Sequence, residues 1–600
     1  MASEAEGCWF DPSQSHQRAR ARAAELCYTI PMHGKQKELT VTALLLGVAI
    51  SIVFGAANAY LGLRVGLTIS ASVPAAVISM GVLRFVLRRD SILENNMVQT
   101  IGSAGESLAA GAIFTLPALY LWAQERPAEF FTPGLLQVTL IALAGGILGV
   151  LVMVLLRRPL IVEDADTLAY PEGRACADVL RAGEAGGRLA KTVFAGLGVA
   201  ALVKFVTGGL KWVSESFLWP IRGRWVRGAM GIEVSPALIG VGYVVGPKVS
   251  SFLFAGGFLG WMVLMPVLIA LKPEAAALWD AGDVRGVWMN YVRYVGAGAI
   301  AMGGFLSLVR SIPLFVRTFR SPPSGKGAAG EPAKETERDL PLRAVLIGIA
   351  CVIVFIWAVP AVPVSFLGAV LIALFGFFFA AVSARMVGLV GSSNNPISGM
   401  TIATLVVSAL VLKTCGTVGA AGMVASIAIG SVVCIVAAIA GDTAQDLKTG
   451  HLLGATPWKQ QVGEFVGVVA AAVVIGGVLV LLHRAWGFGS DAISAPQATL
   501  MKVIVEGIMG GSLPWDLLAI GAGLAVVLAL CRVPVMPVAI GIYLSIKMSF
   551  TIFLGGGLRL LVDRWRPSAT EPCTLFSAGM IAGEGIAGIL IALVTVFAGA

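Results

Sequence analysis

The sequence predicts an all-α, polytopic membrane protein with about sixteen transmembrane helices in two related halves of eight. First, 57% of the 600 residues are hydrophobic and only 13% are charged, too few polar side chains to cover a water-soluble particle. Second, apolar stretches of the roughly 20 residues that span a bilayer recur along almost the whole chain. Third, these stretches lack the alternation of membrane strands, and the chain contains 73 glycines, which favour close helix packing.

Residues 1–38 are expected to form a cytoplasmic tail. The segment is polar, contains Arg18, Arg20 and Arg22, and has no apolar stretch of the kind that a cleavable signal peptide requires. With this tail inside and the spans alternating, Lys and Arg are more frequent in cytoplasmic segments than outside, as the positive-inside rule requires. We therefore predict an integral membrane protein with both termini in the cytoplasm.

The two transmembrane halves are assigned to residues 39–317 and 344–600. Between them, residues 318–343 ("TFRSPPSGKGAAGEPAKETERDLPLR") are rich in proline, glycine and charge, which is typical of a solvated linker. Two arginine-rich exterior segments, "RGRWVRG" at 222–228 and "DRWRP" at 563–567, break the charge trend. We expect these segments to cap helix ends or to line an external vestibule. The alternative is that a nearby span is re-entrant.

Internal matches suggest a duplication. "ENNMVQTI" from Glu94 corresponds to "SNNPISGMTI" from Ser393, and "DVLRAG" after the predicted fourth span corresponds to "DLKTG" from Asp446 after the twelfth. A further match, "AGESLAAG" from Ala104 with "AGEGIAGI" from Ala582, does not fit that register. It is either an older, smaller repeat or a coincidence between two helices rich in alanine and glycine.

A polar stretch, "GSSNNPISGMT" from Gly391 to Thr401, opens a predicted span in the second half. Proline leaves a main-chain carbonyl without its helical partner, and a helix broken in this way exposes main-chain groups that transporters use to bind ions or substrates. The alternative is an ordinary helix start, with an asparagine cap and proline in the first turn, which explains only one asparagine. The candidate substrate-binding residues here are Asn394, Asn395, Ser398 and Thr401.

Acidic residues inside predicted spans are candidates for proton transfer. Glu106 and Glu584 lie well inside spans, where a charged carboxylate costs about 2.5 kcal/mol or more. Each is therefore either paired or protonated for part of a cycle, and such a carboxyl is suited to carry a proton. The alternative is a hydrogen-bonded acid that joins two helices. Glu464 lies closer to the end of its span, and Lys547 is deep enough to require a partner such as Glu584 or Glu106.

The first span contributes two further candidates. It contains "NAYLGLRVG" from Asn58, which places an amide, a phenol and a guanidinium near its outer end. Asn58 and Tyr60 are candidate substrate-binding residues. Tyr60 is equally well explained as an aromatic anchor at the membrane interface.

Enzyme motifs and cofactor sites are missing from the sequence. It contains no GxxxxGK[ST] loop, no GxSxG or HExxH element, and no CxxC pair among its eight cysteines. None of the four histidines lies centrally in a span. We therefore predict a protein that is not an enzyme and that needs neither a cofactor nor a metal site. The net charge of +9 follows from the cytoplasmic loops, so no nucleic-acid partner is expected.

Five stretches resemble the oligopeptide transporter family, in particular its bacterial members close to the plant yellow stripe-like metal-chelate carriers. The two most specific are "SARMVGLVGSSNNPISGMT" from Ser383 and "GDTAQDLKTGHLLGATPWKQQ" from Gly441. "NAYLGLRVGLT", "LAYPEGRACADVL" and "GIYLSIKMSFTIFLGGGLR" support them, and together the five cover both halves in order. The "NPG" and "KIPPR" signatures of the peptide-carrying branch are missing, which leaves metal chelates or another bacterial substrate open.

The resemblance implies a proton-coupled importer of short peptides or metal-chelating amino-acid derivatives in a bacterial inner membrane, working by alternating access. Its expected partners are a small-molecule or peptide substrate, protons and the lipid bilayer; the sequence does not determine the oligomeric state. Tyr170, in "YPEG", is implied to act in gating, although a cytoplasmic turn held by Pro171 and Gly173 explains it equally well. Lys547 is a candidate for gating or charge pairing. A passive channel and a membrane scaffold without transport are the alternative functions.

Overall fold

The computed structural model of the chain describes residues 37–66, 68, 70–89, 91–165, 168–183, 188–223, 227–303, 305–306, 337–392, 395–510 and 514–598. The chain divides into two compact units, Met1–Lys37 and Glu38–Ala600, and the second contains every element below. Residues 1–36 of the predicted tail, residues 318–336 of the predicted linker and Asn394 lie outside the described residues.

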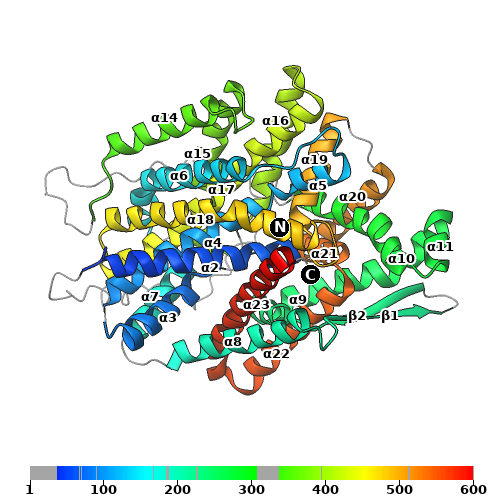
Figure 1. The fold of residues 1–600 in the computed structure, drawn as a ribbon, viewed down its shortest axis with the longest axis horizontal. Coiled ribbons are helices and arrows are strands. Elements are labelled where there is room, and N and C mark those ends of the chain that lie inside the picture. The colour runs from blue at the N-terminus through cyan, green and yellow to red at the C-terminus, as the bar shows by residue number, and fades with distance from the viewer. Residues whose placement is uncertain are drawn as a thin grey trace, which may run out of the picture. The chain divides into compact units, whose positions relative to one another are not determined.

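Helices make up nearly all of the regular structure in Glu38–Ala600 (Figure 1). Among the described residues, ten helical stretches are long and apolar enough to cross a membrane, and three further apolar helices are shorter. Large apolar side chains on these helices are exposed, including Val41, Leu530 and Phe597, as a surface in contact with lipid requires. The predicted class, an all-helical polytopic membrane protein, is confirmed. The arrangement of about sixteen spans in two halves stays a prediction.

Capping residues in the sequence explain where the first helices begin and end. Oγ1 of Thr40 accepts a hydrogen bond from the N–H of Ala43 (3.1 Å), and Gly66, at φ 76°, ends the first helix. Ser91 caps a later helix by accepting from the N–H of Glu94 (3.4 Å). The elements of this region are α2 (Val41–Val65), α3 (Ser72–Gly81), the π-helical turn η1 (Val82–Val86), α4 (Ile92–Ile113), α5 (Pro117–Glu125), α6 (Leu135–Arg157) and η2 (Arg158–Glu163).

The next region contains a β-hairpin between longer helices. Its two strands pair antiparallel, with Ser216 opposite Glu233. Arg222 and Arg227, predicted to lie in an exterior loop, instead end the first strand and begin the second. The elements are α7 (Pro171–Gly183), α8 (Arg188–Lys204), η3 (Phe205–Gly209), β1 (Ser216–Arg222), β2 (Arg227–Glu233), α9 (Pro236–Phe258), η4 (Leu259–Leu264), α10 (Met265–Leu271), α11 (Pro273–Asp280), α12 (Val284–Val287) and η5 (Trp288–Val292).

The second half contains the longest helix. "DLKTG" from Asp446, predicted to follow a span, lies inside this helix, because the helix continues to Leu453. The elements are α14 (Leu342–Ala358), α15 (Phe366–Val390), α16 (Ile397–Thr414), α17 (Gly419–Leu453), α18 (Pro457–Trp486), α19 (Pro496–Met509), α20 (Trp515–Leu530), α21 (Val535–Tyr543), α22 (Ile546–Trp565), η8 (Pro567–Ala569) and α23 (Thr570–Ala598).

α4 and α17 are the interior helices. The most apolar stretches of Ile92–Glu125 and Gly419–Leu453 are 100% and 94% buried, against 28% for Lys191–Gly209. α17 packs against α4, α6, α15 and α16. Polar side chains on α4 and α17 therefore face protein rather than lipid, which is where intramembrane polar residues are tolerated.

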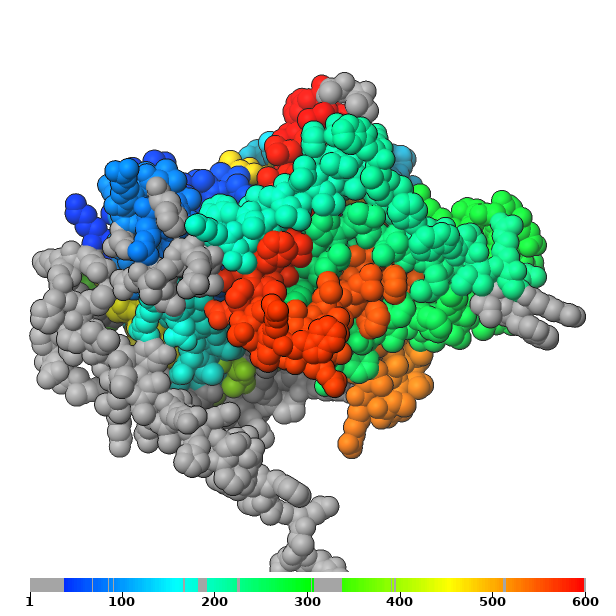
Figure 2. All heavy atoms as spheres, turned by 90° about the horizontal axis from the view of Figure 1, so that it is seen from below, coloured from blue at the N-terminus to red at the C-terminus, as the bar shows by residue number. Residues whose placement is uncertain are grey.

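The helices of the two predicted halves pack against each other. α22 packs along α9, and α23 packs along α8 and α2. α17 and α18 pack along α4 and α6. On the face shown in Figure 2, the orange-red C-terminal segment lies against the teal segment of the first half. Side chains far apart in the sequence can therefore meet between the halves.

Candidate functional site

Asn58 of α2 and Glu106 of α4, both singled out from the sequence, form a direct hydrogen bond. Nδ2 of Asn58 donates to Oε1 of Glu106 at 2.7 Å. The other carboxylate oxygen, Oε2, accepts from the N–H of Ala71 at 3.2 Å, immediately before α3 begins. Both side chains are buried. A predicted substrate-binding residue and a predicted proton-transfer residue thus share one site.

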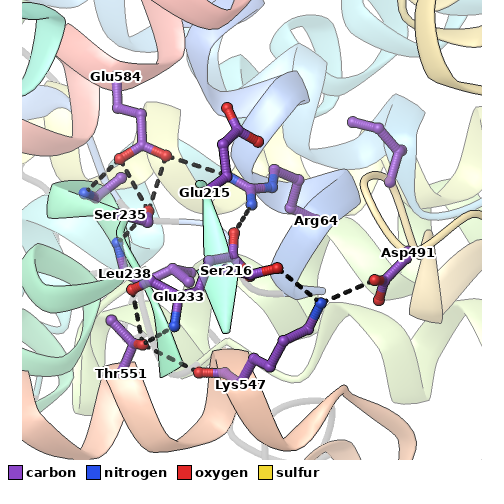
Figure 3. Close-up of polar contacts among 12 residues, drawn as sticks. Arg64, Glu215, Ser216, Glu233, Ser235, Leu238, Asp491, Lys547, Thr551 and Glu584 are labelled. Atoms are coloured by element: carbon purple, nitrogen blue, oxygen red, sulfur yellow. Dashed lines mark hydrogen bonds and ion pairs between the residues drawn. The ribbon is translucent and has the colours of Figure 1, made fainter. Parts of the chain in front are cut away.

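Glu584 of α23 lies in a second, more strongly bonded site (Figure 3). Nη1 of Arg64, on α2, donates to Oε1 of Glu584 at 3.0 Å. The hydroxyl of Ser235 lies 2.8 Å from each carboxylate oxygen, and the N–H of Ala237 donates to Oε2 at 2.8 Å. The same Nη1 donates to the hydroxyl of Tyr60 at 3.2 Å, so this predicted binding residue contacts the site of Glu584.

The two glutamates occupy matched positions around α2. Each follows an Ala-Gly pair in its helix, each accepts from a polar side chain of α2, and each accepts from a main-chain N–H at the start of another helix. Helix starts favour negative charge. The environments differ in one respect: Arg64 balances Glu584 with a positive charge, whereas Asn58 offers Glu106 only a neutral amide. The two similar stretches thus place their glutamates in similar hydrogen-bonding environments.

Arg64 belongs to a larger set of charged groups, which we name the Arg64 cluster: Arg64, Glu233, Glu584, Lys547 and Asp491 (Figure 3). Arg64 also pairs with Glu233, at the end of β2. Burial raises the pKa of the Glu233 carboxyl above its ordinary value, against the opposing charges of Arg64 and Lys547. Lys547 pairs with Asp491 at 2.9 Å. The suggested pairing of Lys547 with Glu584 or Glu106 was therefore wrong, because Arg64 and Asn58 bind those two acids.

Three acids that sequence reasoning did not bring together with Glu106 lie on α17 and α18. Asp442 and Asp446 of α17 act electrostatically on Glu106, and both also act on Glu464 of α18. Asp446 and Glu464 are 0% exposed, so Glu464 does not reach water from the end of its span. We name Glu106, Asp442, Asp446 and Glu464 the acid group. The four-residue spacing of Asp442 and Asp446 was the available signal, since it places both on one helix face.

Hydrogen bonding within the acid group is incomplete. Oδ1 of Asp446 accepts from Oγ of Ser72 at 3.3 Å and from Nε2 of Gln99. Within the described part of the chain, Oδ2 of Asp446 and both carboxylate oxygens of Glu464 have no hydrogen-bond partner of normal geometry. A buried carboxylate oxygen without a donor is costly when it is charged.

Further acids act electrostatically on Glu106 of the acid group. The strongest charged neighbours of Glu106 are Asp442, Glu172 and Asp446. Lys448, which is buried on α17, acts electrostatically on His451. Across the described residues, no three His, Cys, Asp or Glu side chains are arranged to hold one metal ion. Neighbouring carboxyls disfavour one another's charged forms, so this arrangement is suited to bind and release a proton.

The stretch from Gly391 forms a break between α15 and α16. Gly391, at φ 84°, ends α15, and Pro396 precedes α16 without a side-chain cap. Nδ2 of Asn395 donates to Oγ of Ser383 at 2.7 Å, so Asn395 is not the helix cap that the alternative interpretation required. Its Oδ1 is buried and has no partner among the described residues. Oγ1 of Thr401 donates to the carbonyl of Ile397 at 2.9 Å, within its own helix.

Asn395 and Ser398 of this stretch lie next to α17 and in α16, respectively. A Cβ atom on Gly441 would lie 2.8 Å from Nδ2 of Asn395, so Asn395 contacts α17 next to Asp442. Ser398 lies in the first turn of α16. Asn394 lies outside the described residues.

Tyr170 lies where α7 begins, not in a turn. Its backbone is left-handed, at φ 48°, and Pro171 is the first residue of α7. The phenol donates to the carbonyl of Ala384 at 3.3 Å, and the N–H donates to the carbonyl of Gly388 at 2.9 Å. Burial raises the pKa of the Tyr170 phenol, which keeps its proton available for this bond. Tyr170 thereby joins α7 to α15, the helix that ends at Gly391.

Comparisons with known proteins agree over almost the whole chain. The family model described as "OPT oligopeptide transporter protein" matches residues 38–595. A Haemophilus influenzae protein named "Putative oligopeptide transporter" is 36% identical, and the match covers 89% of this chain and 92% of that protein. A "Metal-nicotianamine transporter" of Arabidopsis thaliana is 24% identical, with 92% of both chains covered. A "Probable metal-nicotianamine transporter" of Oryza sativa subsp. japonica is 24% identical and covers 92% of this chain and 88% of its own.

Proposed function

Because this chain belongs to the OPT family of oligopeptide transporters, we propose that it is a proton-coupled secondary transporter working by alternating access. Its substrates would be short peptides or metal chelates. The bacterial relative is named for the first class and the plant relatives for the second. The proposal includes about sixteen spans in two related halves, both termini in the cytoplasm and import across a bacterial inner membrane.

The acid group is the observation that carries this proposal. Four carboxyls from α4, α17 and α18 lie together, and no cation stands among their strongest described neighbours. A structural ion pair would bring its own counter-charge, as Arg64 does for Glu584. Carboxyls whose strongest described charged neighbours are other acids are best accommodated with a bound proton, which a transporter can exchange between the two sides.

Proton transfer at Glu106 would change how three helices are joined. The charged carboxylate accepts from Asn58 of α2 and from the N–H of Ala71 before α3. A proton on Glu106 occupies one of these acceptor positions and weakens the link. Glu106 is therefore the first candidate for the coupling residue. Glu584 is the second, because its proton would compete with the Arg64 ion pair.

The proposed substrate-binding residues are Asn58, Tyr60, Asn394, Asn395, Ser398 and Thr401, with Tyr170 and Lys547 in gating or charge pairing. Among these, Asn395 lies against α17 and its amide oxygen has no hydrogen-bond partner in the described part of the chain, and Asn58 contacts Glu106 directly. A substrate group that displaced the amide of Asn58 would change the hydrogen bonding of Glu106. Such competition is a direct way to couple substrate binding to proton binding.

Uptake into proteoliposomes that contain a pH-sensitive dye tests the proposal. Under an inward proton gradient, we expect acidification with either pooled di- to pentapeptides or iron- or nickel-loaded chelators. Glu106→Gln should abolish proton-driven accumulation and retain counterflow, because a permanently neutral residue still permits exchange. Glu571→Gln, an exposed acid on α23, is the matched control and should behave as wild type.

Two results would contradict the proposal. If Glu106→Gln and Glu584→Gln both accumulate substrate as well as wild type does, the coupling assignment is wrong. If the folded wild type takes up no probe, the transporter proposal itself is overturned for these substrate classes.

A further inference from the structure

A polar cavity is lined by residues that the sequence did not single out. Its volume is about 540 Å³, and it is lined by the ends of α5 and α18, by α19, by residues 289–297 and by Tyr543. α5 and α19 pack side by side around it (Figure 1). This volume is in the range of small-molecule sites. Three cations, two acids and several aromatic rings face it: Arg126, Arg293, Lys502, Glu125, Glu506, Tyr294, Trp486, Phe488 and Tyr543.

The two acids of the cavity form ion pairs with two of its three cations. Nη2 of Arg126 lies 2.6 Å from Oε1 of Glu506, which also accepts from Nε1 of Trp122 at 2.7 Å. Nζ of Lys502 lies 2.5 Å from Glu125 and 3.8 Å from Glu506. These four charges balance each other. Arg293 is the excess positive charge of the cavity.

Arg293 is held by neutral acceptors. Nη1 donates to the carbonyl of Gly489 at 2.8 Å, and Nη2 donates to the carbonyl of Ser494 and the hydroxyl of Tyr543. The residue is 9% exposed, and its Nε has no hydrogen-bond partner among the described residues. No described acid forms an ion pair with it. A buried guanidinium without an anion is costly, so its site is suited to a negatively charged ligand.

We infer that this cavity binds the carboxylate of the transported substrate, with Arg293 as its anchor. The inference rests on the proposed function and adds the ligand group and the residue that holds it. The guanidinium of Arg293 lines the cavity and is held by two carbonyls and one hydroxyl, so its positive charge and planar fork match a carboxylate. The amino group of a zwitterionic substrate would lie toward Glu125, whose side chain is 52% exposed and can exchange Lys502 for a ligand ammonium.

The segment from Gly487 to Ala495 joins this cavity to α2. The carbonyl of Ser494 accepts from Arg293, while its hydroxyl donates to the carbonyl of Arg64 at 2.7 Å. The N–H of Ala495 donates to the carbonyl of Leu63 at 2.7 Å. A carboxylate that draws Arg293 toward the cavity therefore acts on a segment bonded to the end of α2.

The same segment reaches the rest of the Arg64 cluster. Asp491 pairs with Lys547, and Arg64 pairs with Glu584 and Glu233. Asn58, which binds Glu106, is on α2 as well. Ligand binding in the cavity and proton binding at Glu106 thus act on one helix, which provides a route for coupling.

Binding by the purified full-length protein tests the inference. The probes are trialanine, trialanine amide, and a nickel-loaded chelator with free carboxylates; the readout is the midpoint of thermal unfolding against probe concentration. We expect stabilisation by the peptide acid or the chelate and none by the amide. Arg293→Lys keeps the positive charge but loses the planar guanidinium that can bind a carboxylate through two N–H groups. It should weaken binding tenfold or more.

Two further variants keep the test decisive if Arg293→Lys does not fold. Thr499→Phe fills the cavity without changing any bond of Arg293, and should also weaken binding tenfold or more. Ala421→Phe, in a second cavity of about 500 Å³, is the matched control and should bind as wild type. Wild-type binding by Thr499→Phe, or equal stabilisation by trialanine and its amide, would overturn the inference.

Dye-based uptake by the same variants separates this inference from the proposed function. Proton-coupled uptake that is normal in both Arg293→Lys and Thr499→Phe leaves the transporter proposal standing and removes the carboxylate site. No uptake of any probe by the folded wild type removes both.

Discussion

Two glutamates in similar local sequences have different electrostatic partners. Glu584 lies against a guanidinium, whereas Glu106 lies against an amide and three other acids. In general, an opposite charge favours the charged form of a carboxyl, whereas neighbouring acids disfavour it. At the scale of single residues, the partner on α2 is therefore what distinguishes the environments of the two candidate coupling residues.

Removing the guanidinium of Arg64 should destabilise the protein strongly. Arg64→Met leaves Glu233 and Glu584 buried without their cation, which typically costs about 3–5 kcal/mol. We expect a lower midpoint of thermal unfolding in detergent. Arg64→Met combined with Glu584→Gln should recover part of the loss, because one buried charge is removed.

The control for this prediction is Arg343→Met, an exposed arginine in the first turn of α14, which should leave the midpoint unchanged. If the Arg64→Met protein is as stable as wild type, the acids of the Arg64 cluster are hydrated or protonated. The stability of the protein then does not depend on their ion pairs with Arg64.

At the scale of elements, α2 is the helix on which the sites converge. It packs against α4 and α23, which bring Glu106 and Glu584, and residues 494–497 bond to its last turn. Close packing against α4 depends on Gly105, because a Cβ atom there would lie 2.0 Å from Oγ of Ser51 and 2.7 Å from its carbonyl oxygen. Small residues at such crossings let membrane helices approach closely.

Gly105→Ala should therefore separate α2 from α4. We expect a loss of about 1–3 kcal/mol in unfolding free energy, the usual cost of overpacking, and impaired proton-driven uptake, because Asn58 and Glu106 move apart. Thermal unfolding in detergent and dye-based uptake measure the two effects. Gly477→Ala on α18 is the control, since a Cβ atom added there would meet no other atom within 4 Å. Wild-type values for Gly105→Ala would contradict the tight crossing.

At the scale of the whole chain, the two predicted halves interleave within Glu38–Ala600. α22 and α23 pack against α9, α8 and α2, so first-half and second-half residues build each site together. The cavity lies at the end of α18 that contains Trp486, whereas the loop with Arg88 lies before the N-terminal end of α4. With the amino terminus inside, these two places face opposite sides of the membrane.

Cysteine labelling in intact cells tests this orientation. In a variant whose native cysteines are replaced by serine, a membrane-impermeant maleimide should label Ser490→Cys from outside, because Ser490 lines the cavity. Arg88→Cys should react only after permeabilisation, because the predicted topology places its loop in the cytoplasm. Labelling of Arg88→Cys in intact cells, with Ser490→Cys protected, would reverse the assigned topology.

Local sequence was sufficient for some conclusions. Hydropathy indicated the membrane class, and the motifs from Ser383 and Gly441 led to the family that the comparisons support. Glu106 and Glu584 attracted attention because a carboxyl within an apolar run is costly wherever the run packs. The break at Gly391 was also predictable, since proline and glycine act on their own backbone.

The sequence by itself therefore determined that this is a membrane protein, which family it belongs to and which residues are costly to bury. Each of these conclusions depends on short segments that can be read separately. Only the tertiary structure decided which groups meet. Arg64 and Glu584 are 520 residues apart, Lys547 pairs with Asp491 rather than with a buried glutamate, and Asp446 lies inside α17 instead of after it. Such pairings depend on which helix faces cross, and local hydropathy does not encode the orientation of one helix face toward another.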